Sequence, residues 1–429
     1  MRELIHPGQL TGFSARVVGA GASGRGAVKL LCALGADVRL LDNGSPSDET
    51  RELCERLGVP LDVGEHTKSQ FEGADLVVLS PGIARSTLDE VLEDVADRKV
   101  VAELELASWF TSEPVIAVTG TNGKTTTASL TAAMLKAGGK NVFLGGNIGT
   151  PLSEYLVSDQ RADILVLEVS SFQLQNCRSF KPHVGVLLNF SPNHLDYHRD
   201  MEEYLAAKLN LFARQTDKDL AIAPLELKKE LTKREWTKAK QAYFVPTDRF
   251  KSDKLIGPHN QANMEAAWLA ARAFGVTEEQ AGGAVAAFEP KPHRLQVVAD
   301  VNGVLFVDDS KATTIEALGA ALMSFDRPIR LLAGGRYKGG DPSAIKHLVE
   351  QRVASVCLFG ESREVFEPAW EGAASISWEA TLEPAVKRLY AESEPGDVIL
   401  LSPATSSFDL YENYKARGDD FRRIAEGLA

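Results

Sequence analysis

The chain has 429 residues, of which 44% are hydrophobic and 25% charged, a composition typical of a globular protein. This length exceeds what one ordinary core accommodates and predicts two or three domains. The formal net charge of −12 argues against a general nucleic-acid or membrane-surface binder, which would need a positive field, although a local basic pocket for phosphate remains compatible with it.

The cysteines and the N-terminus indicate a cytoplasmic protein. Cys32, Cys54, Cys177 and Cys357 are scattered and form no C-x-x-C pair, which argues against a disulfide framework or a zinc site. The opening MRELIHPGQL lacks the apolar stretch of a signal peptide. No apolar run approaches the roughly 18 residues that span a bilayer, so we expect no membrane insertion.

Strand-like and helix-like segments alternate along the chain and restart twice. Short apolar strands with intervening helices indicate parallel sheets. The first series predicts strands at 15–20, 36–42 and 74–82 and a helix at 23–35. The second predicts strands at 114–120, 162–171 and 183–192, a helix at 124–139 and a solvated charged segment at 225–240. The third follows a proline-containing linker at 289–294, with strands at 304–310, 329–335, 354–360 and 397–404.

A glycine motif follows the first predicted strand. Gly19, Gly21 and Gly24 match G-x-G-x-x-G between a strand and a helix, and Asp42 ends the next strand. This is the dinucleotide fingerprint in its usual context, so one interpretation is an NAD or flavin dehydrogenase. Two others are a purely structural turn and a diphosphate of another nucleotide at the helix N-terminus. The motif alone leaves all three open.

A second glycine loop, GTNGKTT (120–126), is more specific. It lies between a strand and a helix and ends in the Gly-Lys-Thr of a phosphate-binding loop. The usual G-x-x-x-x-G-K-[ST] pattern requires glycine at 118, where this chain has Val118, but Gly120 still supplies a flexible point. Backbone N–H groups can cradle phosphates, Lys124 can neutralise their charge and Thr125 can offer a hydroxyl to Mg²⁺. This loop predicts ATP binding.

Three further residues are candidates for an ATP site. Glu168 ends a buried strand, where α/β ligand sites form and where Mg²⁺ would find an oxygen ligand. His194 follows the next strand in the equivalent place, with Asp196 and His198 as nearby alternatives. Lys208 lies on an apolar helical stripe, which indicates either a snorkelling lysine or a lysine whose charge is altered to suit a buried site.

Motifs along the whole chain resemble the Mur ligase family. They are GTNGKTT, LEVSSFQL (167–174), NHLDYH (193–198) with AAK (206–208), GPHNQAN (257–263), PHRLQ (292–296), DDSKATT (308–314), LLAGG (331–335) and LLSPATSSFD (400–409). The resemblance is strongest to the branch that adds D-glutamate. It implies three α/β domains: a Rossmann-like UDP-substrate domain (1–103), a P-loop ATPase domain (104–290) and a Rossmann-like amino-acid domain (291–429).

The resemblance also implies a reaction. The carboxylate of UDP-N-acetylmuramoyl-L-alanine attacks the γ-phosphate of ATP, and the amine of D-glutamate then attacks the resulting acyl phosphate, in peptidoglycan precursor synthesis. Two Mg²⁺ sites are expected from Thr125, Glu168, His194 and Lys208, the last as a carbamylated lysine. Lys124, His194, Lys208 and Asn147 are the expected catalytic residues, Asn147 facing the reacting carboxylate.

The remaining binding residues follow from the same resemblance. ATP is expected at Gly120, Thr121, Asn122, Gly123, Lys124, Thr125, Thr126, Asn260, Asn263, His293, Arg294 and Asp309. The UDP group is expected at Gly21, Ala22, Ser23, Asp42, Asn43, Ser80 and Gly82. D-Glutamate is expected at Lys311, Thr313, Lys338, Ser407 and Tyr414.

The chain departs from the family pattern at several positions. Asn193 stands where aspartate is common, Tyr414 replaces a phenylalanine, and Thr405-Ser406 replaces Cys-Ala. The segment GGRYKGGD (334–341) around Lys338 also differs from the family pattern. The D-N-P-R motif of diaminopimelate-adding members is absent. Glutamate is therefore favoured, with the choice between the D and L forms left open.

Two other classes of function remain as alternatives. An NAD-dependent oxidoreductase would use the first glycine motif but leaves the Lys124 loop unexplained. A P-loop switch without ligase activity would turn over ATP independently of any amino acid. We expect a monomer.

Overall fold

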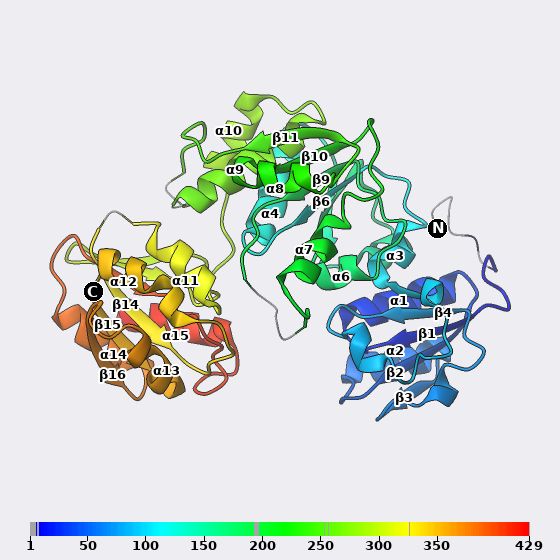
Figure 1. The fold of residues 1–429 in the computed structure, drawn as a ribbon, viewed down its shortest axis with the longest axis horizontal. Coiled ribbons are helices and arrows are strands. Elements are labelled where there is room, and N and C mark those ends of the chain that lie inside the picture. Colours follow the sequence, from blue (N-terminus) through cyan, green and yellow to red (C-terminus); the bar gives the residue numbers. More distant parts are fainter. Residues whose placement is uncertain are drawn as a thin grey trace. The chain divides into compact units, whose positions relative to one another are not determined.

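The computed structural model describes residues 6, 8–192, 197–252, 254–255, 257–325 and 327–428. Three sheets follow one another along the chain, each with helices between its strands, which confirms the predicted α/β class (Figure 1). Contacts divide the chain into two compact units. One lies within 1–190, 194–245 and 266–284 and holds the first two sheets; the other lies within 191–193, 246–265 and 285–429 and holds the third.

The first sheet is parallel, with strand order β3-β2-β1-β4-β5. Side chains of the strands alternate between two apolar clusters, one on each face, and helix α1 packs on the face that contains Val17 and Leu40. The elements are β1 (Ser14–Val18), α1 (Ala22–Ala33), β2 (Asp37–Asp42), α2 (Asp48–Leu57), β3 (Leu61–Val63), β4 (Leu76–Leu79), β5 (Val100–Ala102) and α3 (Glu103–Ser108).

The central sheet is also parallel, with strand order β11-β10-β9-β6-β8-β7. Its inner strands are buried along their whole length, as expected of a sheet covered on both faces. The elements are β6 (Val115–Thr119), α4 (Lys124–Ala137), β7 (Val142–Gly146), α5 (Leu152–Val157), β8 (Ile164–Glu168), α6 (Ser171–Gln175), β9 (Val184–Leu187), α7 (Met201–Leu209), β10 (Leu220–Pro224), α8 (Lys228–Lys233), β11 (Lys240–Phe244), α9 (Pro258–Arg272) and α10 (Glu278–Ala286).

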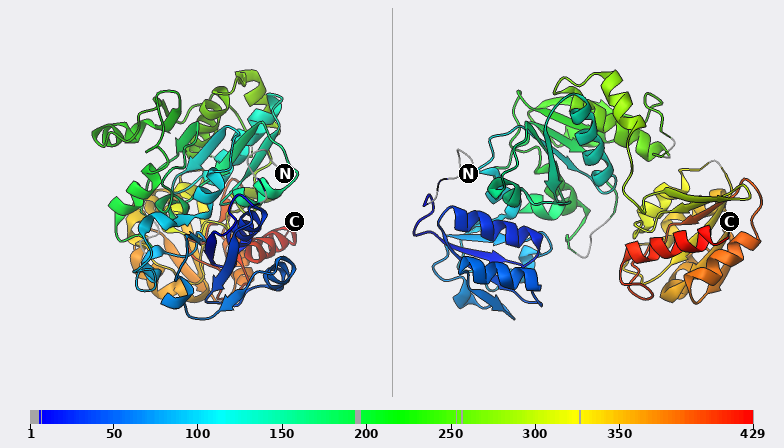
Figure 2. Two further views of the ribbon diagram at one scale, coloured as in Figure 1. Left: turned by 90° about the vertical axis from the view of Figure 1, so that its right-hand side faces the viewer. Right: turned by 180° about the vertical axis from the view of Figure 1, so that it is seen from behind.

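The third sheet has strand order β12-β13-β17-β14-β15-β16. Helix α15 crosses one of its faces (red in the right-hand view of Figure 2) and shares a cluster with α14, while α11, α12 and α13 cover the other face. The elements are β12 (Gln296–Val301), β13 (Val304–Asp308), α11 (Ile315–Leu322), β14 (Ile329–Gly334), α12 (Lys346–Arg352), β15 (Val353–Phe359), α13 (Arg363–Ala369), β16 (Ser375–Glu379), α14 (Leu382–Ala391), β17 (Val398–Leu401) and α15 (Tyr414–Glu426).

The sequence predicted the buried inner strands and missed the short or peripheral ones. Strands β12 and β16 at the edges of the third sheet are half exposed and carry no long apolar run. Strand β12 also pairs antiparallel with β13, so the third sheet is mixed. The charged segment 225–240 contains the short helix α8, and its Leu231 and Trp236 are buried beneath the solvated face. No helix in the described ranges has the length and apolar character needed to cross a bilayer.

Two buried carboxylates on α3 join the first sheet to the central one. Glu103 accepts a hydrogen bond from the backbone N–H of Ser153 at 2.7 Å, at the start of α5. Glu105, 1% exposed, accepts from the backbone N–H groups of Ser179 (2.8 Å) and Phe180 (2.9 Å) and from the Trp109 indole (3.1 Å). These donors satisfy the carboxylate without a direct cation and fix the loop 179–180 against α3.

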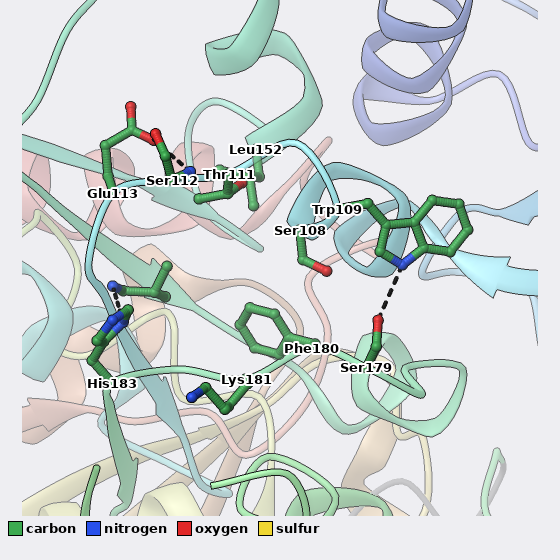
Figure 3. A pocket seen from close by; sticks show the side chains of 11 residues that line it. Ser108, Trp109, Thr111, Ser112, Glu113, Leu152, Ser179, Phe180, Lys181 and His183 are labelled. Carbon is green, nitrogen blue, oxygen red and sulfur yellow. Dashed lines mark hydrogen bonds between the residues drawn. The ribbon is translucent and has the colours of Figure 1, made fainter. Parts of the chain in front are cut away.

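A cavity of about 220 Å³ lies beside this junction (Figure 3). Trp109, Phe180 and His183 line it, and the Nδ1 atom of His183 accepts the backbone N–H of Val115 at 3.2 Å. Val115 begins β6 and His183 precedes β9, so the cavity lies at the amino ends of these parallel strands. Ligand sites in parallel sheets form at the opposite, carboxyl ends.

Glu105→Ala should destabilise the first unit strongly, because it removes the acceptor for the backbone N–H groups of residues 179 and 180, the second of which is buried. Hydrogen bonds to a charged group contribute about 1.5–3 kcal/mol each, so we expect a loss of about 3 kcal/mol or more in urea unfolding followed by circular dichroism. Glu93→Ala, which removes the exposed partner of Lys68, is the control and should leave unfolding unchanged. Equal unfolding curves for both variants would contradict the assigned role of Glu105.

Candidate functional site

Two glycines shape the loop after β6. Gly120 has φ +152°, and a Cβ there would lie 2.9 Å from the Leu188 Cβ on the neighbouring segment. Gly123 has φ +80° and is the N-cap residue of α4, in the left-handed region where glycine is favoured. The close approach of this loop to the end of β9 therefore requires glycine at position 120.

Asn189, which the sequence reasoning overlooked, holds this loop. Its Oδ1 accepts from the backbone N–H groups of Thr121 (3.0 Å) and Asn122 (2.9 Å), and its Nδ2 donates to the Asn122 carbonyl at 3.1 Å. Asn189 follows β9 in the same topological place as other candidates, and a polar residue directly after a buried strand was the available signal.

Two lysines meet at one backbone oxygen of the loop. The Nζ atoms of Lys124 and Lys208 each donate to the Gly120 carbonyl at 2.9 Å. Lys124 also donates to the Thr121 carbonyl at 2.8 Å. Lys208 is 1% exposed, and its Nζ lies 4.3 Å from the ring centroid of Tyr204. Burial, and then the charge of Lys124, hold the pKa of Lys208 well below its ordinary value.

The structure therefore excludes the snorkelling interpretation of Lys208. A snorkelling lysine keeps its ammonium in water, whereas this Nζ is enclosed and faces the phosphate loop. A lowered pKa makes the neutral, nucleophilic form of this amine more accessible than in an exposed lysine.

An oxygen cluster lies beside the loop. The Thr125 hydroxyl donates to Glu168 Oε2 at 2.7 Å, and the Asn147 amide donates to Glu168 Oε1 at 3.0 Å. Glu168 is 3% exposed at the end of β8. A carboxylate, a hydroxyl and an amide form an oxygen-rich donor set that suits Mg²⁺, which takes few protein ligands and completes its shell with phosphate and water. Among the described residues no group of three His, Cys, Asp or Glu side chains forms a metal cage, which is compatible with such an open site.

The expected histidine ligand, His194, falls outside the described residues, as do Asn193 and Asp196. The alternative His198 is 1% exposed, and its Nε2 lies 2.9 Å from the Ser171 hydroxyl. Ser171 begins α6, whose capping box is formed by Ser170 and Gln173 of the LEVSSFQL motif. His198 thus packs against the segment that follows Glu168.

The other residues expected around ATP belong to the second unit. The Asn263 amide donates to Asn260 Oδ1 at 3.1 Å, and both side chains are buried on α9. His293 has φ +64°, and its Nδ1 lies 2.7 Å from Asp308 Oδ2. A Cβ on Gly418 would lie 2.2 Å from His293 Nδ1, so glycine is required there for the pair to form.

Asp309 is a buried carboxyl at the end of β13. It accepts from the Ser402 hydroxyl at 2.9 Å and from the backbone N–H of Leu295 at 3.2 Å. Burial raises its pKa to about 7, and the Asp308 charge adds to this, while these hydrogen bonds and the nearby Arg294 guanidinium work in the opposite direction.

The residues expected to bind the amino acid lie on loops at the carboxyl ends of β13, β17 and β14, which are neighbours in the sheet. Lys311 follows β13, and its Nζ lies 4.3 Å from the Tyr414 ring centroid at the start of α15. Lys338 follows β14, and its Nζ lies 5.1 Å from the ring centroid of Phe408, which adjoins Ser407. Thr313 precedes Thr314, the N-cap residue of α11. Phe408 was missed from sequence.

The loops after β14 and β17 are joined by backbone hydrogen bonds. Arg336 and Ser406 exchange N–H···O bonds of 3.0 and 3.1 Å. Five expected positions are thereby distributed over one edge of the third sheet, with Lys338 exposed and Ser407 buried.

The first sheet gathers its candidates in the same way. Gly21 is the N-cap residue of α1, followed by Ala22 and Ser23. Asp42 accepts from the backbone N–H groups of Ala20 (2.6 Å) and Gly44 (2.8 Å), and so ties the turn after β1 to the turn after β2 that contains Asn43. After β4, the Ser80 hydroxyl donates to the Gly19 carbonyl at 2.9 Å, and exposed Gly82 follows.

Models of one family match the chain in three consecutive segments. The Mur ligase MurD-like N-terminal domain matches residues 14–101, the Mur ligase middle domain matches 118–253, and the Mur ligase glutamate ligase domain matches 293–405. Together with the relatives below, these matches show that the chain belongs to the Mur ligase family.

Two relatives are named UDP-N-acetylmuramoylalanine–D-glutamate ligase. The protein of Desulfovibrio desulfuricans is 52% identical over 97% of this chain and 97% of its own length. That of Lawsonia intracellularis is 48% identical over 96% of this chain and 94% of its own length. Among solved structures, the MurF ligase of Thermotoga maritima in complex with ADP has a TM-score of 0.62 at 18% identity, covering 100% of this chain and 99% of that one. This last likeness concerns the fold.

The stability of the fold should fall as pH rises through the range in which the Asp309 carboxyl titrates. An unfolded aspartate ionises near pH 4, whereas Asp309 in the folded chain retains its proton to about pH 7. Between these two pH values the carboxyl loses its proton only in the unfolded state. The free energy of unfolding therefore falls by up to about 4 kcal/mol over this range, and the loss stays constant at higher pH.

Asp309→Asn should remove this slope, which urea unfolding at pH 5 and pH 7.5 measures. Asp300→Asn, at an exposed position near the end of β12, is the control and should keep the wild-type slope. An identical pH dependence in wild type and Asp309→Asn would show that Asp309 ionises normally.

Proposed function

We propose that this chain is an ATP-dependent ligase that joins D-glutamate to the L-alanine carboxylate of UDP-N-acetylmuramoyl-L-alanine. The observation that carries the proposal is the near-complete alignment, at 52% and 48% identity, with relatives named for this reaction. The phosphate loop and the oxygen cluster beside it support the ATP-dependent half-reaction.

Each sheet takes one substrate in this proposal. Residues 1–103 bind the UDP group at the turns after β1, β2 and β4. Residues 104–290 bind the ATP phosphates at 120–126, and residues 291–429 bind the amino acid at the loops after β13, β14 and β17. Asn260, Asn263, His293, Arg294 and Asp309 are further proposed ATP-binding residues.

The reaction proceeds in two balanced steps. A carboxylate oxygen attacks the γ-phosphorus of ATP, the bond to ADP breaks, and an acyl phosphate forms. The amine of D-glutamate then attacks the acyl carbon, inorganic phosphate leaves with the attacking carboxylate oxygen, and the amine loses a proton. Because two anions meet in the first step, positive charge must screen them, and Lys124 with the backbone N–H groups of its loop supplies it.

Thr125 and Glu168 are the residues that would hold Mg²⁺ beside the loop, with Asn147 orienting the carboxylate. His194 is the proposed ligand of a second Mg²⁺. When bound, Mg²⁺ supplies charge neutralisation for the phosphate oxygens. Thr125 and Glu168 are both buried and hydrogen-bonded to each other, which fixes their positions.

Lys208 is proposed to act as a carbamate. Its neutral amine can attack CO₂, forming an N–C bond and releasing a proton, which converts a potential cation into an anion. The enclosed Nζ and the charge of Lys124 support this, because an anion beside Lys124 is favourable where a second cation is not. The carbamate oxygens would give Mg²⁺ a ligand that an amine cannot.

Two lysines on loops of the third sheet are the proposed binding groups for the amino acid. Lys311 and Lys338 would bind carboxylates of the incoming glutamate, with Thr313, Ser407 and Tyr414 around it. L-Glutamate is the alternative substrate that the same cations would accept.

We further propose that the protein acts as a monomer in the cytoplasm, where ATP and UDP-linked precursors are available.

Phosphate release should require both proposed substrates. With ATP and UDP-N-acetylmuramoyl-L-alanine present, we expect release with D-glutamate and not with L-glutamate or without an amino acid. Release with L-glutamate alone would reassign the amino acid, and release independent of any amino acid would favour a simple ATPase.

Lys124→Ala should lower turnover at least about 1000-fold, since it removes the charge that stabilises the phosphoryl-transfer transition state. Lys136→Ala, in the last turn of the same helix and exposed, is the matched control and should turn over like wild type. Near-normal turnover of Lys124→Ala would reject the ATP-site assignment.

Lys208→Ala should be nearly inactive and should recover part of its turnover when formate or acetate is added, because a small acid can occupy the carbamate position. Wild type incubated with ¹³C-bicarbonate should give a carbamate carbon signal in NMR that this variant lacks. Full activity of Lys208→Ala in bicarbonate-depleted buffer would exclude the carbamate.

A further inference from the structure

A fully buried arginine lies at the start of α15. Arg417 is 0% exposed, and its hydrogen bonds go to hydroxyl and carbonyl oxygens. Its Nε donates to the Ser310 hydroxyl at 2.9 Å, and its Nη2 donates to the carbonyls of Ser310 and Thr405, each at 3.0 Å. Its Nη1 donates to the Ser406 carbonyl at 3.3 Å. One guanidinium therefore links the loop after β13 to the loop after β17.

A third loop packs on the same group. A Cβ on Gly335 would lie 3.1 Å from Arg417 Nη1, so the backbone after β14 touches the guanidinium. The Ser310 hydroxyl, which accepts from Arg417, donates in turn to the Tyr414 carbonyl at 2.8 Å. The network thus returns to the first turn of α15.

The neighbours of these contacts are the residues expected to bind the amino acid. Lys311 follows Ser310, Ser407 follows Ser406, and Lys338 lies on the loop that Gly335 begins. Arg417 touches only backbone and Ser310 in these contacts, so it orders the three loops without occupying the place of a substrate.

The cost of burying a charge indicates that this arrangement serves more than packing. Burial lowers the pKa of Arg417 to about 10, so the group stays cationic at neutral pH. A buried cation is expensive unless its donors are satisfied, and here a planar fork of donors matches oxygens on two separate loops. Lysine, with one nitrogen, cannot reach the same set.

We propose that Arg417 is a positioning residue for the amino-acid substrate, holding Lys311, Ser407 and the Lys338 loop in the register that binding requires. This inference rests on the proposed function, in which these loops bind the amino acid. Arg417 acts through its neighbours, so its loss should weaken binding of the amino acid more than binding of ATP.

The test compares Arg417→Lys and Arg417→Ala with Arg423→Lys, an exposed arginine on the same helix. Steady-state phosphate release is measured with the amino acid that wild type uses, at a temperature well below the unfolding midpoint of each variant. For Arg417→Lys we expect KM for the amino acid to rise about tenfold or more and KM for ATP to stay within about twofold of wild type. Arg423→Lys should match wild type in both.

The outcomes are separable. An unchanged KM for the amino acid in folded Arg417→Lys, or equal increases in both KM values, would overturn the positioning role. If Arg417→Ala does not fold, Arg417→Lys decides; if neither folds, Arg417 is a residue of the core and the role is rejected. A wild-type enzyme that uses no amino acid would instead reject the proposed function.

Discussion

Two lysines that share the Gly120 carbonyl set the constraint on which the central site depends. Two ammonium groups cannot both stay charged in an enclosed space at low cost, and Lys208, the buried one, has the lowered pKa. Both lysines reach the Gly120 carbonyl because the loop bends back against Leu188. Glycine at position 120 permits this close approach. The displaced glycine, the buried lysine and the phosphate loop therefore belong to one arrangement.

The same topological rule operates in all three sheets. Many candidate residues lie where parallel strands end: after β1, β2 and β4, after β6, β8 and β9, and after β13, β14 and β17. Lys208 on α7 and Asn260 and Asn263 on α9 are exceptions. At these edges the loops leave the sheet, and polar groups reach a surface while apolar strands stay buried. The proposed function assigns one substrate to each of these edges: a nucleotide-linked acid, ATP and an amine.

Sequence reasoning placed the elements correctly where a pattern is local. The loop between β6 and α4, the place of Glu168 at the end of β8 and the buried strands were predictable because glycine spacing, strand-end carboxylates and apolar runs are local features. The roles of these residues in binding stay predictions. Lys208 could be singled out as a lysine on an apolar stripe, but the residue that decides its charge, Lys124, is distant along the chain and was identified only in space.

The missed residues share a different property. Asn189, Phe408 and Arg417 act through contacts with segments far away in sequence, and Arg417 lies in a helix whose composition is that of a charged surface element. The antiparallel β12 was missed because half-exposed edge strands carry a weak pattern. Residues whose roles depend on contacts with distant segments could not be predicted, whatever their residue type.

The central claim is that ATP bound at the phosphate loop transfers its γ-phosphoryl group to a substrate carboxylate. The direct measurement uses UDP-N-acetylmuramoyl-L-alanine labelled with ¹⁸O in its carboxylate, with ATP and D-glutamate, and determines the isotope content of the released phosphate by mass spectrometry. Because the attacking oxygen leaves with phosphorus, the account predicts one atom from the labelled carboxylate in each phosphate released. Product formation with unlabelled phosphate would contradict it.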